Sequence, residues 1–152
     1  MSMDKGALAR QLEAKLKALV DQARKFSDET KTEAKTGANR AVNLHKATSG
    51  RVEAAHAAWE AVSSFHPKPL PKGAPISVGA IVELEDGEGG KTLFLAPAGA
   101  GEELTGPDGD GFLHVVTPVS PIGKALLGRR VGDAVEVMIK GELAEWEIVY
   151  AG

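Results

Sequence analysis

Two stretches within the first 66 residues repeat apolar positions at the heptad spacing of a coiled coil. The first, between residues 4 and 26, has six consecutive apolar seam positions: Ala9, Leu12, Leu16, Leu19, Ala23 and Phe26. The second has a seam that is weak near its start and strong near its end: Ala41, His45, Thr48, Val52, Ala55, Trp59 and Val62. Because a lone amphipathic helix is only marginally stable in water, we expect the two stretches to pack as an antiparallel helical hairpin.

The polar segment between the two stretches, residues 27–40, is predicted to form the distal tip of this hairpin, with its turn near Gly37. Helices of this length would hold the tip on the order of 35 Å from the base. Three acids gather there, Asp28, Glu29 and Glu33. They are interpreted either as helix caps and solvated charges, or as carboxylates presented to a site inside a partner.

The pattern changes after a proline-rich linker at residues 66–75. Short apolar or alternating runs, separated by glycine-rich turns, then predict five strands, at residues 77–84, 91–96, 112–117, 133–140 and 143–150. Residues 99–111 are expected to form a polar loop. A short helix is expected at residues 120–128, with Pro121 in its first turn and Gly128 at its end. The chain is therefore predicted to be an α+β protein with a helical hairpin (1–65), a linker (66–75) and an antiparallel sheet domain with one short helix (76–152).

Composition separates these two halves and excludes several classes of function. Residues 1–66 carry a net charge of +3, and residues 67–152 carry −6 together with all eight prolines. The acidic half is a poor candidate for sequence-specific DNA binding, which needs clustered cations. With no cysteine and no close histidine pair, the chain has no disulfide framework and no familiar zinc motif. It has no apolar run of membrane-spanning length and no signal-peptide pattern at its start, so we expect a cytoplasmic protein. We also expect it to be a monomer.

Residues 117–133, TPVSPIGKALLGRRVGD, resemble the C-terminal signature of Gre-type transcript cleavage and elongation factors (GreA/GreB-like). The shared pattern is Ser-Pro, a short aliphatic helix, glycine, and then Gly-Asp before a valine-rich strand. The resemblance covers about 75–80 residues by sequence, and the first 66 residues mainly by architecture. It implies an N-terminal coiled-coil hairpin followed by an FKBP-like C-terminal domain.

The resemblance also implies a function. Such factors dock on RNA polymerase at the rim of its secondary channel and insert the hairpin, where tip acids help to hold a Mg²⁺ of the polymerase during cleavage of backtracked RNA. Asp28, with Glu29 or Glu33, would be the acids that support catalysis, and Asp28 and Glu29 the metal ligands. Lys31 stands where cleavage-stimulating members carry the second acid. The chain would then be an accessory factor to the polymerase and not itself an enzyme.

Ser120, Pro121, Arg129 and Arg130 are the candidate polymerase-binding residues; their alternative roles are helix capping and ordinary surface charge. A second functional reading is a non-catalytic regulator that occupies the same channel. A third is a peptidyl-prolyl isomerase, whose pocket would need the aromatic residues of the second half: Phe94, Phe112, Trp146 and Tyr150.

Overall fold

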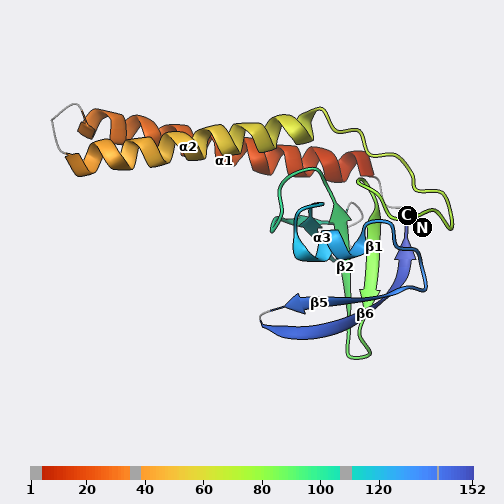
Figure 1. The fold of residues 1–152 in the computed structure, drawn as a ribbon. Helices are drawn as coiled ribbons and strands as arrows, with labels where there is room; N and C mark the ends of the chain where they lie inside the picture. Colours follow the sequence, from red (N-terminus) through yellow and green to blue (C-terminus); the bar gives the residue numbers. More distant parts are fainter. Residues whose placement is uncertain (1–4, 35–38, 107–110, 140) are drawn as a thin grey trace.

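The computed structural model describes the backbone of residues 5–34, 39–106, 111–139 and 141–152, and the side chains of these residues except 27–34, 39–49 and 138–139. Two long helices, α1 (Lys5–Ala34) and α2 (Asn39–Ser63), run side by side in opposite directions. They precede a six-stranded sheet with one short helix, so the predicted α+β arrangement is confirmed (Figure 1). The remaining elements are β1 (Ile81–Glu85), β2 (Gly90–Leu95), β3 (Glu103–Thr105), β4 (Phe112–Val116), α3 (Pro121–Leu126), β5 (Ala134–Ile139) and β6 (Glu142–Ala151).

The helices extend further toward the tip than the heptad pattern indicated. The segment expected as a polar tip, residues 27–40, is helical up to Ala34, and the next helix begins at Asn39. Its glutamates, lysines and alanines are good helix formers, and no glycine or proline interrupts them before Gly37. These helix-forming residues therefore extend α1 beyond the last apolar residue of the predicted seam.

The sheet has the strand order β3-β4-β2-β1-β6-β5, and its strands are antiparallel except for one parallel pair, β2 with β4. The sequence predicted five strands in a wholly antiparallel sheet and assigned residues 99–111 to a loop. The missed strand β3 lies within that loop and pairs with β4. This extra reversal of the chain makes β4 run parallel to β2. β1 begins at Ile81, four residues later than predicted, because residues 77–80 form a turn.

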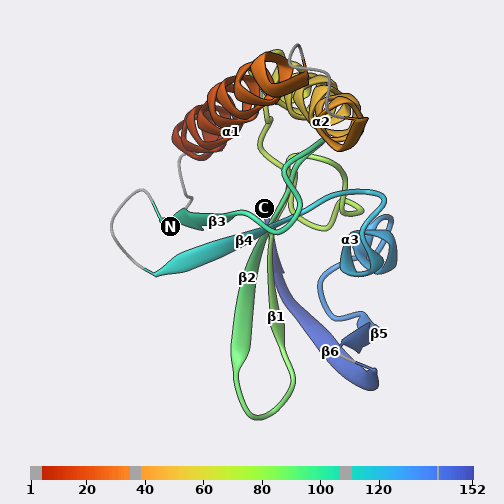
Figure 2. The same ribbon diagram turned by 90° about the vertical axis from the view of Figure 1, so that its left-hand side faces the viewer.

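Each face of the sheet covers its own apolar core. On one face, α3 packs over a cluster that includes Val82, Leu95, Leu126, Trp146 and Ile148. On the other face, the base of the helical hairpin packs over the sheet, and this second cluster has ten buried members: Leu8, Leu12, Leu16, Val62, Ile81, Phe94, Ala96, Leu104, Leu113 and Val115. Figure 2 shows the hairpin above the sheet near β3 and β4, with α3 on another side next to β5. The hairpin is thus part of the folded core at its base.

The apolar stripe of α1 differs from the predicted heptad seam. The buried residues follow a spacing of four, with Leu8, Leu12, Leu16 and Val20 each at most 4% exposed. Two predicted seam residues, Leu19 and Phe26, are 42% and 44% exposed. The sheet and α2 together select this face, because α1 has to bury its base against both.

Candidate functional site

The tip acids lie on the part of α1 that is farthest from the sheet. Positions 28, 29 and 33 belong to the last two turns of the helix, which project beyond the sheet domain (Figure 1). In a continuous helix, positions 29 and 33 are one turn apart on one face, whereas positions 28 and 29 lie about 100° apart around the axis. The side chains of Asp28, Glu29 and Glu33 lie outside the described residues, so their role as metal ligands stays a prediction.

The base of the hairpin is joined to the sheet by close packing at Leu12. Its side chain is fully buried and approaches Gly99 so closely that a Cβ at that glycine would lie 2.8 Å from Leu12 Cδ1. Gly99 also has a φ of +93°, a conformation that favours glycine. The loop before β3 can therefore press against α1 only because this position has no side chain.

Polar contacts strengthen the same junction at both ends. Gln11 of α1 exchanges two hydrogen bonds with the backbone of Thr105 in β3. Lys5, at the start of α1, donates from Nζ to the carbonyl oxygen of Lys68 in the linker at 2.8 Å. Burial lowers the pKa of the Lys5 ammonium from its ordinary value of 10.5. These contacts fix the direction in which the hairpin leaves the sheet.

A cluster around Trp59 holds α1 against α2 next to this junction. Lys17 Nζ lies 4.8 Å from the centre of the Trp59 ring and 3.6 Å from Asp21 Oδ1. His56 packs edge-on against the same ring, with ring centroids 5.5 Å apart, and its Nδ1 lies 3.4 Å from Glu60 Oε1. Trp59 therefore acts as a packing centre between the two helices.

The candidate residue Ser120 is engaged within its own segment. It caps the N-terminus of α3: its hydroxyl accepts from the backbone N–H groups of Gly123 and Thr117, at 3.2 and 3.1 Å, and donates to Thr117 O at 2.8 Å. Pro121 is exposed at the first position of the helix, where its missing N–H costs nothing. Ser120 consequently shapes the segment, and Pro121 is the member of the pair whose ring reaches the surface.

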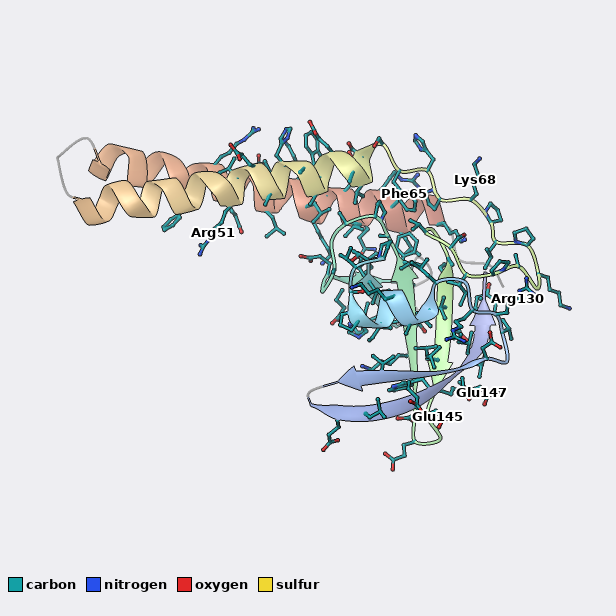
Figure 3. The ribbon with its side chains drawn as sticks, viewed as in Figure 1. Arg51, Phe65, Lys68, Arg130, Glu145 and Glu147 are labelled. Carbon is teal, nitrogen blue, oxygen red and sulfur yellow. The ribbon has the colours of Figure 1, made fainter. Side chains whose placement is uncertain are left out.

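The two candidate arginines follow α3 on the surface. Ile76, directly after the linker, exchanges backbone hydrogen bonds with Gly128 and Arg129 and so joins the start of the sheet domain to the end of α3. The Arg130 N–H donates to Asp133 Oδ2 at 2.9 Å, which closes the turn before β5. Both arginine side chains are exposed, and Figure 3 shows Arg130 at the margin of the sheet domain beside the linker. Their guanidinium groups are accessible to a partner.

The aromatic residues considered for an isomerase pocket are spread over different parts of the sheet domain. Phe94 is buried under the hairpin, and Trp146 is buried in the core on the opposite face. Phe112 is 62% exposed on β4, and Tyr150 lies near the C-terminal Gly152. These four side chains do not come together around one cavity.

The described residues contain neither a metal-binding cluster nor a membrane-spanning helix. Within the described ranges, no group of three or more histidine, aspartate or glutamate side chains is arranged to hold a metal ion. None of the helices in the described part of the chain is both long enough and apolar enough to cross a membrane.

Comparison with known proteins identifies the second half of the chain. Residues 71–151 match the protein family described as "Transcription elongation factor, GreA/GreB, C-term". GreA of Alkaliphilus oremlandii is 34% identical over 74 residues, which are 49% of this chain and 43% of that protein. GreA of Polaromonas naphthalenivorans is 30% identical over 100 residues, 66% of this chain and 60% of that protein. The matched segments thus span about half the length of these relatives. Among solved structures, GreA factor homolog 1 of Thermus thermophilus aligns over 99% of this chain and 96% of its own, at 21% identity and a TM-score of 0.40.

Proposed function

Because this chain belongs to the GreA/GreB family of transcription elongation factors, we propose that it binds RNA polymerase and regulates elongation by placing the distal end of its hairpin in the secondary channel. The sheet domain would hold the factor at the channel rim through Pro121, Arg129 and Arg130. Ser120 would keep Pro121 in position from within the segment.

The observation that supports this proposal most is the way the hairpin is built. Its base shares a buried core with the sheet, and the last α1 residue in that core is Leu16. The 18 residues from Lys17 to the end of α1 at Ala34 then extend about 27 Å at the helical rise of 1.5 Å per residue. A rod that is anchored at one end and free along most of its length suits insertion into a narrow channel.

At the free end, we assign Asp28, Glu29 and Glu33 the role of presenting carboxylates inside the polymerase. Carboxylate oxygens are the hard ligands that Mg²⁺ prefers, and a bound Mg²⁺ would polarise the RNA phosphate and activate water for cleavage. Asp28 and Glu29 would hold the ion, and Glu33, one turn beyond position 29 on a continuous helix, would orient water beside it.

Lys31 supports a second candidate, a regulator that occupies the channel without stimulating cleavage. Lys31 occupies the position at which the family resemblance places the second acid of a cleavage-stimulating tip. An ammonium group about 4 Å from a metal ion opposes its binding by several kcal/mol at an effective dielectric constant of about 20. Such a factor would slow or redirect elongation by occupying the channel.

The two candidates are separated by an assay on backtracked elongation complexes made with core RNA polymerase from the same organism. The full chain is compared with Asp28→Ala, Glu29→Ala and Glu33→Ala, and Glu53→Ala, an exposed acid on α2, serves as the matched control. Loss of stimulated cleavage in a tip variant but not in the control supports the cleavage factor. A wild-type chain that changes elongation without cleavage supports the non-catalytic regulator. A wild-type chain that does not bind polymerase overturns both.

A further inference from the structure

A groove runs along the hairpin where α1 has left the sheet. Its volume is about 310 Å³, and it is lined by Leu19, Gln22, Ala23 and Phe26 of α1 and by Arg51 of α2. The two large apolar side chains in it are 42% and 44% exposed. None of its described lining residues belongs to the α3 segment, and the proposed function so far gives this groove no role.

The exposure of Leu19 and Phe26 follows from how α1 is packed. Val20, not Leu19, is fully buried at this level of the helix, so the buried stripe turns away from the heptad seam. Leu19 and Phe26 are seven residues apart, which places them on one face about two turns, or roughly 10.5 Å, from each other. Together with Ala23 they form an apolar strip along α1 that lines the groove and lies outside the core shared with the sheet.

The charge around the groove indicates what kind of partner it suits. The described side chains of residues 5–26 and 50–63 include seven cationic and four acidic groups: Lys5, Arg10, Lys15, Lys17, Arg24, Lys25 and Arg51 against Glu13, Asp21, Glu53 and Glu60. Asp21 is already paired with Lys17. Arg51 is exposed, and Figure 3 shows its side chain extending from α2 on the side of the hairpin where the sheet lies. Among the described side chains, Arg51 lines the groove, and Arg24 and Lys25 lie next in sequence to Ala23 and Phe26, so the described charge at the groove is positive.

We infer that this groove binds an acidic segment of RNA polymerase that carries an aliphatic or aromatic anchor residue. The anchor would lie between Leu19 and Phe26, and a carboxylate beside it would pair with Arg51. This inference rests on the proposed function, and it adds a contact midway along the hairpin that would fix how deeply the rod enters the channel. The hairpin of a second copy is a poorer occupant, because it would bring two cationic surfaces together.

The test measures the affinity of the full chain for core RNA polymerase from the same organism, by fluorescence anisotropy of a labelled factor. Phe26→Ser and Arg51→Glu remove the apolar and the charged part of the groove. Phe112→Ser, at an exposed phenylalanine on β4, and Arg10→Glu, at an exposed arginine near the base of α1, are the matched controls. Leu19→Gln provides a second apolar test if Phe26→Ser lowers the thermal stability of the hairpin.

Each groove variant should weaken binding about tenfold or more, and each control should stay within about twofold of the wild type. The wild-type affinity should also fall more steeply with added salt than that of Arg51→Glu. If the wild type binds and all groove variants bind equally well, the inference is wrong and the proposed function stands. If the wild type does not bind polymerase, the proposed function fails, and this inference fails with it. If sedimentation shows that the wild type is a dimer and that Phe26→Ser is a monomer, a second copy is the occupant and the inference is overturned.

Discussion

The side-chain amide of Gln11 in α1 is paired with the backbone of Thr105 in β3. Gln11 Nε2 donates to Thr105 O at 3.0 Å, and Thr105 N donates to Gln11 Oε1 at 2.7 Å. The two residues are 94 positions apart in the chain. One side chain thus satisfies a backbone donor and a backbone acceptor of a three-residue edge strand, and it joins the hairpin to the outermost strand of the sheet.

Replacing Gln11 with alanine should loosen this junction. Two hydrogen bonds are lost, and the free energy of unfolding should fall by about 1 to 2 kcal/mol in urea denaturation. The Thr105 amide should exchange its hydrogen faster. Gln22→Ala, at an exposed glutamine of the same helix, is the control and should leave both quantities nearly unchanged. Equal behaviour of the two variants would contradict the role of this pair.

Leucines at two predicted seam positions should differ sharply in their contribution to stability. Leu12 is fully buried between α1 and the sheet, so Leu12→Ala should cost about 2 to 5 kcal/mol through lost burial and a residual cavity. Leu19 is 42% exposed, and Leu19→Ala should change stability by less than about 1 kcal/mol. Urea denaturation of both variants measures the difference. Similar losses in stability would mean that both leucines are buried, as the heptad pattern predicted, and would contradict the observed packing.

Gly123→Ala should be strongly destabilising. A Cβ at this position would lie too close to the Thr117 carbonyl oxygen, which already accepts from Ser120 Oγ at 2.8 Å. The start of α3 would have to shift, at a cost of more than about 2 kcal/mol. Gly50→Ala is the opposite case. Gly50 lies in α2 with open space around it, and alanine there should raise stability by about 0.5 to 1 kcal/mol. Thermal unfolding of the two variants should therefore move in opposite directions.

Asp86, in the turn between β1 and β2, should titrate below its ordinary value. The backbone N–H groups of Glu88 and Gly89, each 2.9 Å from Asp86 Oδ1, lower the pKa of this carboxyl from 3.8. A depressed pKa stabilises the turn at pH values above 3.8, and this stabilisation is lost as the pH falls through the folded-state pKa. Carboxyl-carbon NMR should give a midpoint below 3.8 in the folded chain and one close to 3.8 in urea. A folded midpoint at or above the unfolded one would contradict the contact.

Local sequence patterns predicted the elements whose cause is local. The heptad spacing predicted two long helices, because a stripe of apolar residues has to be buried. The order Ser120, Pro121 and Gly128 predicted a capped short helix, and α3 begins directly after Ser120. The same segment pointed to the GreA/GreB family, which residues 71–151 confirm. These features depend on neighbours within a few positions along the chain.

Features that depend on residues far apart in the chain could not be predicted from local sequence patterns. β3 has three residues, and its ladder with β4 and its bonds to Gln11 come from elsewhere in the chain. The parallel pairing of β2 and β4 follows from that missed strand.

The face of α1 that is buried was likewise decided by the assembled molecule. Leu12 and Leu19 look alike in the heptad, yet only Leu12 meets the sheet, and the groove beside Phe26 exists because the sheet ends before α1 does. The amino-acid order determines which side chains would lower the free energy of the chain by leaving water. Which of them actually leave it is settled by surfaces that approach one another only when residues far apart in the chain are brought together.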